Sequence, residues 1–381
     1  VPLTLKTHKI PRFVRPVVIA LISVLLIVAA ALTGCKLSSL SNSKPPQNTV
    51  DQAKEAEANQ EVKNETHDPV PQPEPVKKSY NVLTGLETTS DLADLRPVAI
   101  IISNDAYSLP QFGIGNADIL VEVPLEDGST RLALLTTNYR NMTTIGSVAS
   151  TRSYLMEICN AFHTVQCFNG SDGTVNAEKL ANYDILDYDS QNLAGMYYYD
   201  DTRFDETDLM TNGILVDAGM RKAGYADKDG TDYLPFIFAG VGKTAPAGKK
   251  NATMASIRYS DNLNVTFTYD SATRQYVRYE YGEKQIDAAT NTSVTFDNLF
   301  ILCASSVTYE TEDNKSLDLV MEDGGSGYYM SNGTVTNFIW KYAEDGTIDF
   351  YDMEGNQLAV NRGTSYIGFV TAGAKDTISI R

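Results

Sequence analysis

Arg131 and Arg152 are the residues of this chain whose type and position point most directly to chemistry. Arg131 follows Gly128-Ser129-Thr130 at the start of an expected strand, and Arg152 follows Ser150-Thr151 at the start of an expected helix. Guanidinium groups beside hydroxyl groups and the free N–H groups of a helix start suit a carboxylate or a phosphate. The residues expected to bind such a ligand are Asn104, Thr130, Arg131, Ser150, Arg152 and Ser171.

Three acids in the same part of the chain give the arginines an alternative role. Asp118, Glu122 and Glu126 could pair with Arg131 and Arg152 in an acidic network that only holds the loops together. Two of these carboxylates could also act as general acid and general base. The catalytic residues, if there are any, therefore stay open.

Histidine and cysteine offer little other chemistry. One histidine, His163, lies in the part of the chain expected to fold, which is too few for a Ser-His-Asp triad or a histidine-rich metal site. Cys159, Cys167 and Cys303 have apolar neighbours and are expected as buried thiols, with a Cys159–Cys167 bridge as the alternative. We expect no metal and no cofactor.

Two stretches resemble ligand-binding motifs but lack residues that those motifs require. "FAGVGKT" ends like a phosphate-binding loop, but its first glycine would fall at Ile237. "YADKDGTDYLPF" (225–236) would need acids at both ends to bind calcium, and has Tyr225 and Phe236 there. Its acids Asp227, Asp229 and Asp232 are therefore expected in a solvated turn.

Strands and helices are expected to alternate along residues 80–240, and these elements must position the candidate site residues. Strands are expected at 96–104, 117–126 and 130–139, where β-branched or alternating apolar residues lie between turn residues. Helical spacing predicts helices at 152–165, with Ser150 or Thr151 as N-cap, and at 177–183. Such alternation favours an α/β layer domain.

The rest of the chain has a different pattern. Residues 241–253 are rich in Gly, Ala and Lys and are expected as a linker. Short alternating segments with hairpin-type turns fill 254–375 and predict a mostly antiparallel β domain, either a sandwich or a partly closed barrel. The expected fold class is thus α+β.

The N-terminal part predicts export and anchoring. Residues 1–34 carry basic residues and then an apolar run too short to span a membrane comfortably, which is typical of a signal peptide. The run ends in Leu32-Thr33-Gly34-Cys35, which resembles the bacterial lipobox, so Cys35 is the expected site of lipid attachment and the membrane the expected partner. Residues 35–79 are polar and proline-rich, as in a disordered tether.

The charge of the chain limits its partners. The formal net charge is −17, and the residues before Cys35 contribute four basic side chains and no acid, so the chain from Cys35 onward carries −21. A surface of this sign argues against nucleic acid and is compatible with cationic partners or divalent ions.

Several spaced motifs between residues 80 and 375 resemble one family. They are "SNDAYSLPQFGIGNADILVEVPLEDGSTRLALL", "IGSVASTRSYLMEICNAF", "QCFNGSD" and two later segments at 269–302 and 338–370. These stretches are similar to the YerB-like bacterial lipoproteins, which carry a two-part domain of unknown function. The matching positions are Asn104, Pro110, Gln111, Gly113, Ala117, Asp118, Glu122, Glu126, Gly128, Thr130, Arg131, Gly146, Val148, Ser150, Arg152, Gly170 and Ser171.

The chain departs from the family pattern at a few positions. Ser147 and Ala149 stand where the family has Pro and Arg, and Thr211 stands at a histidine position. The resemblance implies an extracytoplasmic lipoprotein without implying an activity. We therefore expect a binding or scaffolding module for an envelope component or partner protein; the alternative is a hydrolase or transferase acting on cell-wall glycan or peptide.

Overall fold

A β-branched segment forms the strand at the middle of the structure. The strand expected at 96–104 is β3 (Val98–Ser103), and all six of its residues are buried. It pairs antiparallel with β5 (Thr130–Thr136), which pairs antiparallel with β4 (Ile119–Pro124). A strand that is apolar throughout requires cover on both faces of its sheet, and the other elements supply that cover.

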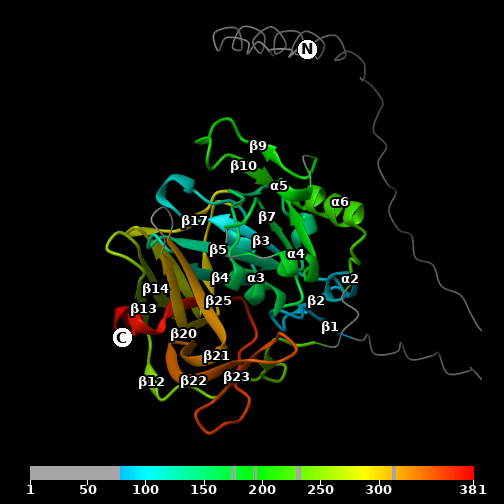
Figure 1. Cartoon of the computed structure of the whole chain (residues 1–381). Helices are drawn as coiled ribbons and strands as arrows, with labels where there is room; N and C mark the ends of the chain where they lie inside the picture. Colours follow the sequence, from blue (N-terminus) through cyan, green and yellow to red (C-terminus); the bar gives the residue numbers. More distant parts are fainter. Residues whose placement is uncertain are drawn as a thin grey trace, which may run out of the picture. The chain divides into compact units, whose positions relative to one another are not determined.

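These strands belong to a large mixed sheet. The computed structural model describes residues 78–381 apart from 173–174, 176, 192, 194, 229–232 and 311–314, and Figure 1 shows how the elements of this part are arranged. The sheet runs in the order β12 (Lys250–Asn251), β22 (Thr334–Tyr342), β21 (Lys315–Ser331), β20 (Asn298–Glu310), β25 (Ser365–Thr371), β4, β5, β3, β7 (Val165–Phe168) and β8 (Ile185–Asp187), with β23 (Ile348–Tyr351) beside β22.

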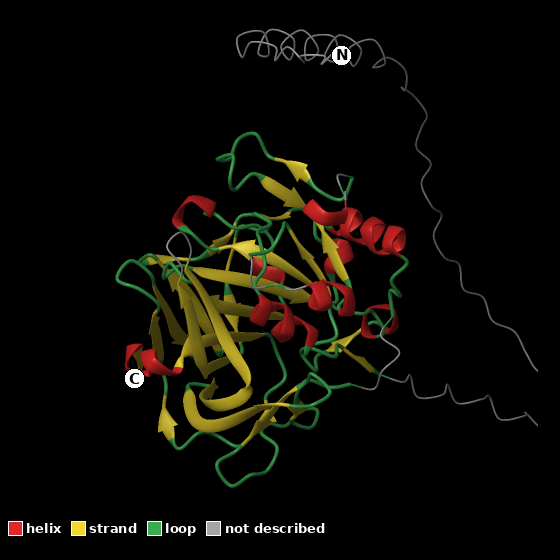
Figure 2. Ribbon diagram, viewed as in Figure 1, coloured by secondary structure: helices red, strands yellow, loops and turns green. Residues whose placement is uncertain are grey.

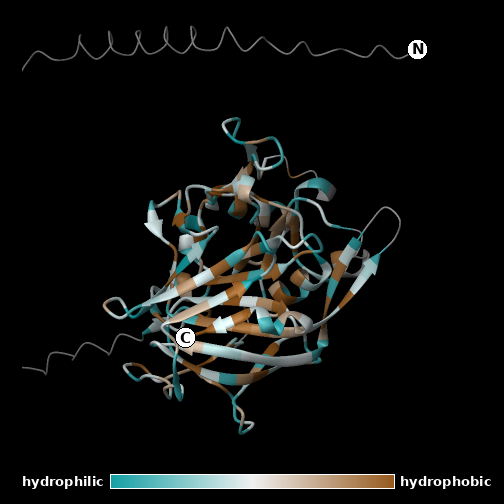
Figure 3. Ribbon diagram, turned by 90° about the vertical axis from the view of Figure 1, so that its left-hand side faces the viewer, coloured by the Kyte–Doolittle hydropathy of each residue, from teal (hydrophilic) through white to brown (hydrophobic). Residues whose placement is uncertain are grey.

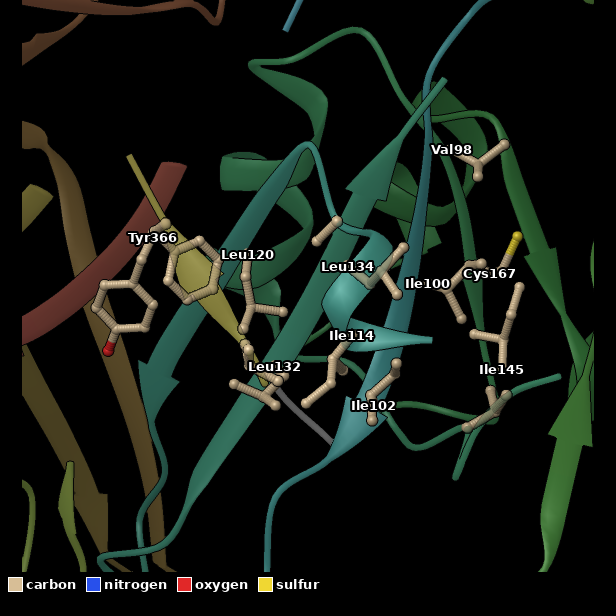
Figure 4. Close-up of a cluster of buried hydrophobic side chains, with 14 of the residues drawn as sticks. Val98, Ile100, Ile102, Ile114, Leu120, Leu132, Leu134, Ile145, Cys167 and Tyr366 are labelled. Atoms are coloured by element: carbon tan, nitrogen blue, oxygen red, sulfur yellow. The ribbon is translucent and has the colours of Figure 1, made fainter. Parts of the chain in front are cut away.

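Strand alternation sorts the side chains onto two faces of this sheet. Even-numbered residues of β3, β4 and β5 lie in one hydrophobic cluster, and odd-numbered residues of the same strands lie in another. Figure 4 shows the first cluster, in which Ile100 and Ile102 of β3 lie near Leu132 and Leu134 of β5. We call the even-numbered side the sheet face and the odd-numbered side the helix face.

A second sheet covers the sheet face. Phe267 and Phe296 from this sheet approach Tyr366 of β25, with ring centroids 4.6 Å and 5.8 Å away. Two sheets therefore stack face to face in this region. The second sheet contains β16 (Glu283–Lys284), β15 (Gln275–Glu280), β14 (Asn264–Asp270), β13 (Met254–Arg258) and β26 (Ile378–Ile380), with β19 (Thr295–Phe296) beside β15.

Helices and small sheets complete the described part (Figure 2). The helices are α2 (Ser90–Ala93), α3 (Ser153–Asn160), α4 (Ala177–Asn182), α5 (Tyr188–Gln191) and α6 (Gly213–Ala223), and the 3₁₀ turns are η1 (Ala106–Ser108), η2 (Ile114–Asn116), η3 (Tyr139–Asn141) and η4 (Ala372–Thr377). The small sheets are β1 (Ser79–Tyr80) with β2 (Glu87–Thr88), β6 (Ile145–Gly146) with β10 (Leu209–Thr211) and β9 (Tyr198–Tyr199), β11 (Ile237–Phe238) with β24 (Ala359–Val360), and β17 (Ile286–Asp287) with β18 (Thr292–Ser293).

Helix α3 covers the helix face and differs from its expected bounds. Its apolar residues, including Leu155 and Ile158, join the odd-numbered cluster. The N-cap is Arg152, not Ser150 or Thr151, and no side chain caps the helix. Thr151 lies just before the helix, where its backbone N–H is bonded to the carbonyl of Gly170 at the edge of the sheet.

The fold as a whole is largely β, with few helices in the described residues. Hydrophobic residues (brown in Figure 3) are concentrated in the strands at the centre. The α/β layer expected for 80–240 is not confirmed as a separate architecture. Since β25 pairs in parallel with β4, the regions 80–240 and 254–375 share one sheet, and their division into domains at 241–253 remains a prediction.

The N-terminal expectations lie outside the described residues. The signal peptide (1–34), Cys35 and nearly all of the tether belong to the part of the chain that the structure does not describe. Among residues 78–381, with the gaps given above, no helix combines the length and the apolar character that crossing a membrane requires.

Candidate functional site

The residues expected to bind a ligand gather at one edge of the large sheet. Strands β7 and β8 run parallel to β3, so their carboxyl ends meet at the same edge. The antiparallel strand β5 starts there, with Arg131 opposite Ser103. The segment before α3 joins this edge, since Ala149 donates its N–H to Ile101 and accepts one from Asn169. Ligands of open sheets commonly bind at such carboxyl edges.

Arg131 and Arg152 meet at a single hydroxyl group. Arg131 Nη2 lies 3.5 Å from Ser150 Oγ, and Arg152 Nη1 lies 3.3 Å from the same oxygen. Arg131 Nη1 also donates to Ser103 Oγ over 3.1 Å. The hydroxyl of Ser103 in turn donates to Asp105 Oδ2 at 2.7 Å. The two guanidinium groups are thus brought together, as the sequence suggested.

The two arginines differ in how their charge is balanced. Arg152 forms a bidentate pair with Glu126, at 2.6 Å and 3.2 Å, and lies 3.3 Å from Asp172. Arg131, by contrast, forms no ion pair within the described residues, and its buried Nε has no hydrogen-bond partner. Burial, reinforced by the nearby charge of Arg152, lowers the pKa of Arg131 to about 10. The side chain therefore remains a cation at neutral pH and forms no direct ion pair among the described residues, although the charges of Asp105, Asp127 and Glu126 act on it at longer range.

Asn104 and Thr130 do not join Arg131. Each is a sequence neighbour of a residue on the helix face, so strand alternation turns its side chain to the sheet face. Asn104 Nδ2 lies 2.7 Å from Thr130 Oγ1 and 3.2 Å from Glu122 Oε1, and Thr130 donates to that carboxylate at 2.8 Å. Ser171 reaches the edge through a backbone bridge with Thr151.

The centre of this second group is Arg278, which the sequence analysis missed. Its guanidinium lies 2.8 Å from Glu122 and 3.0 Å from Glu280, and all three side chains are almost completely buried. Tyr366 donates to Glu122 at 2.8 Å. Gln111 and Gln285 complete the group, because Gln111 donates to Asn104 and Gln285 donates to Gln111.

Burial disfavours the charged form of a carboxylate in this group. It raises the pKa of Glu280, although Arg278 acts in the opposite direction. The sequence carried no clear signal for the missed residues: in "QYVRYE" the residues alternate along a strand, but only the structure shows that Tyr276, Arg278 and Glu280 are the buried set. Charged residues in an alternating strand would ordinarily be assigned to the solvent side.

The three acids expected as one network lie in three separate settings. Glu122 is bound to Arg278 and Glu126 to Arg152. Asp118 instead accepts the backbone N–H of Thr137 at 2.8 Å, and burial raises its pKa. The three acids therefore have separate partners in the structure, and Glu126 is the one that pairs with Arg152.

The described residues contain no group of three or more His, Cys, Asp or Glu side chains arranged to hold a metal ion. Asp227 pairs with Arg140 at 3.0 Å, whereas Asp229 and Asp232 lie outside the described residues. Cys159 and Cys167 are free, buried thiols, and burial raises the pKa of both. Since the thiolate is the nucleophilic form, neither cysteine is set up as a nucleophile.

Comparison with known proteins identifies the family. The N-terminal and C-terminal models of the protein of unknown function DUF3048 match residues 83–226 and 255–367. A candidate lipoprotein of Bacillus subtilis (strain 168), YerB, is 28% identical over 308 residues, which is 78% of this chain and 88% of the relative.

The fold agrees with that relationship. The crystal structure of the YerB protein from Bacillus subtilis superimposes with a TM-score of 0.70 at 24% identity, covering 79% of this chain and 99% of the solved chain. Both halves of the family pattern are thus present, in order, over most of the described residues. The chain belongs to the DUF3048 family of proteins of unknown function.

Proposed function

We propose that this chain is an extracytoplasmic binding protein, anchored to the membrane by a lipid on Cys35, that holds an anionic ligand at Arg131. The observation that carries the proposal is the half-buried Arg131 guanidinium, which has no carboxylate partner among the described residues. Placing a cation in a partly buried position without a counter-ion is unfavourable. An anion bound beside it would supply the missing charge.

The hydrogen bonds of Arg131 within the described residues leave several of its donors unused. A guanidinium has five N–H donors, and the structure uses two of them, one to Ser103 and a longer one to Ser150. Both serine hydroxyls also border the site. A carboxylate, phosphate or sulfate group matches the planar fork of the remaining donors.

The surrounding elements suit this role. The parallel strands β3, β7 and β8 end at this edge and α3 begins there, which supports the α/β arrangement that we propose for residues 80–240. Arg152 is held by Glu126 and fixes the position of Ser150. In this proposal Arg152 positions the site and Arg131 binds.

Anchoring is the second part of the proposal. The apolar run that ends in Leu32-Thr33-Gly34-Cys35 supports it, and so does the description of the relative YerB as a candidate lipoprotein. Two or more acyl chains hold a protein at a bilayer far more firmly than one. The binding site would then face the cell envelope.

The carboxylates do not favour the enzyme alternative. Glu122 and Glu280, which share Arg278, have exposed fractions of 0% and 3%. A general acid or base must come within hydrogen-bond reach of its substrate, and these two are enclosed by protein groups. Their arrangement supports a structural role.

Titration calorimetry of the whole chain tests the binding proposal. Inorganic phosphate and the dicarboxylate glutarate are the probes, and Arg131→Gln should weaken the binding of at least one by about 1–3 kcal/mol. Arg274→Gln is the matched control, because Arg274 is exposed and bonded to Asn332 in another part of the structure. Equal affinities of the parent and Arg131→Gln for both anions would contradict the proposal.

A further inference from the structure

A hollow lined by aromatic residues lies between the segment after β3 and the loop that joins β9 to β10, and Arg131 is not among its lining residues. It has a volume of about 420 Å³ and is open to solvent. The loop from β9 to β10 projects at the top of Figure 1. The residues lining the hollow are Tyr107, Leu109, Pro110, Phe112, Asp200, Thr202, Arg203 and Phe204.

Two aromatic rings stand out at this hollow because solvent reaches most of their surface. Tyr107 is 73% exposed and Phe204 is 67% exposed. Their centroids lie 5.9 Å apart in an edge-to-face arrangement, although the residues come from segments far apart in the sequence. Large exposed apolar surfaces of this kind commonly mark an interaction site.

Arg203 lines the hollow and binds the segments on both sides of it. Its guanidinium lies 5.5 Å from the centroid of Phe112 and donates to the carbonyls of Thr207, Pro110 and Ser108. These bonds connect the two segments that carry the exposed rings. Arg203 thus has a structural role, and its guanidinium is hydrogen-bonded to backbone carbonyl oxygens.

The remaining charge around the hollow is negative. The loop 200–208 contains one arginine and the acids Asp200, Asp201, Asp205, Glu206 and Asp208. The hydroxyl and N–H of Thr202 bind Asp200 and lower its pKa, so this lining residue is ionised at neutral pH. Burial raises the pKa of Asp208, and repulsion by Asp205 and Asp200 adds to the shift.

We infer that this hollow is a docking site for a basic peptide segment of a partner protein. Aromatic ring faces attract Lys and Arg side chains, and the acidic loop adds long-range attraction for the same sign of charge. The aliphatic stem of such a side chain can lie against Leu109 and Pro110 while its charged end stays near Asp200. The lining residues of this hollow do not include Arg131, and the hollow has the opposite charge preference to the anion site proposed there.

Fluorescence anisotropy with a labelled peptide of alternating lysine and leucine tests the inference on the whole chain. Tyr107→Ala and Phe204→Ala should each weaken binding by about tenfold, and added salt should weaken it further. Tyr309→Ala is the matched control, because Tyr309 is an exposed ring on β20 and should leave the affinity unchanged.

Other probes separate this inference from its alternatives. The same peptide with glutamate in place of lysine should not bind. Unchanged affinity in both ring variants would overturn the inference. So would preferential binding of uncharged cell-wall glycan fragments, since sugars also stack on aromatic rings but do not depend on the acidic loop. Thermal unfolding of each variant confirms that it is folded.

Discussion

The guanidinium of Arg278 lies 2.8 Å from the carboxylate of Glu122 in the space between the two stacked sheets, and solvent reaches neither side chain. Glu122 belongs to β4, within the first matched family segment, and Arg278 belongs to β15, within the second. The ion pair therefore joins the two halves of the family pattern. Because Glu280 binds the same arginine, one cation serves two buried carboxylates.

Removing Arg278 should strongly destabilise the chain. Arg278→Met would leave Glu122 and Glu280 buried without a counter-charge, and breaking a buried pair in this way costs about 3–5 kcal/mol. Urea denaturation measures the free energy of unfolding. Arg274→Met, at an exposed arginine, is the control and should change it little. A loss for Arg278→Met no larger than that of the control would show that the buried group does not stabilise the fold.

Glu280 should make stability fall as the pH rises. Burial raises its pKa in the folded state, so above its ordinary pKa the unfolded chain loses this proton more readily than the folded chain does. The contribution of Glu280 to folding therefore declines as the pH rises through its folded-state pKa. Glu280→Gln should flatten this decline in unfolding measurements made from acid to neutral pH. A pH profile identical to that of the parent would count against a raised pKa.

Substitutions of Arg131 and Arg152, the two arginines at the sheet edge, should have different effects on the stability of the fold. Arg152→Gln removes the partner of Glu126 and leaves that carboxylate near Asp172, which should cost about 1–3 kcal/mol. Arg131→Gln removes a cation that has no counter-ion in the described residues, so stability should stay equal or rise. Thermal unfolding of the two variants measures the difference. A larger loss for Arg131→Gln than for Arg152→Gln would mean that Arg131 has a structural role.

Cys35 should be required for anchoring. Cys35→Ala removes the thiol that would carry the lipid, so the chain should stay unprocessed and run as a longer form when produced in a bacterial host. Incorporation of radiolabelled palmitate provides the measurement, and Cys303→Ala is the control because Cys303 is a buried thiol. If the Cys35 variant takes up as much palmitate as the parent, the anchoring prediction is wrong.

The strands around the site could be predicted from the sequence, because a strand that is buried on both faces is a continuous run of apolar residues. The run that forms β3 is apolar throughout, and β4 and β5 follow it with a short turn between them. The meeting of Arg131 with Arg152 could also be anticipated, since each follows hydroxyl residues at the start of an element. In these cases the residue pattern within each segment was sufficient for the prediction.

The tertiary structure decided which residues share a face. Asn104 and Thr130 could be grouped with Arg131 from their sequence positions, but the two-residue period of a strand directs neighbouring side chains to opposite sides. Only the stacking of a second sheet brings Arg278 and Glu280 to Glu122. Likewise, the meeting of Tyr107 and Phe204 depends on how distant segments pack. The sequence by itself determined the strands around the site, and the export signal stays a prediction from it. The contacts between elements required the fold, because they join residues that no local pattern connects.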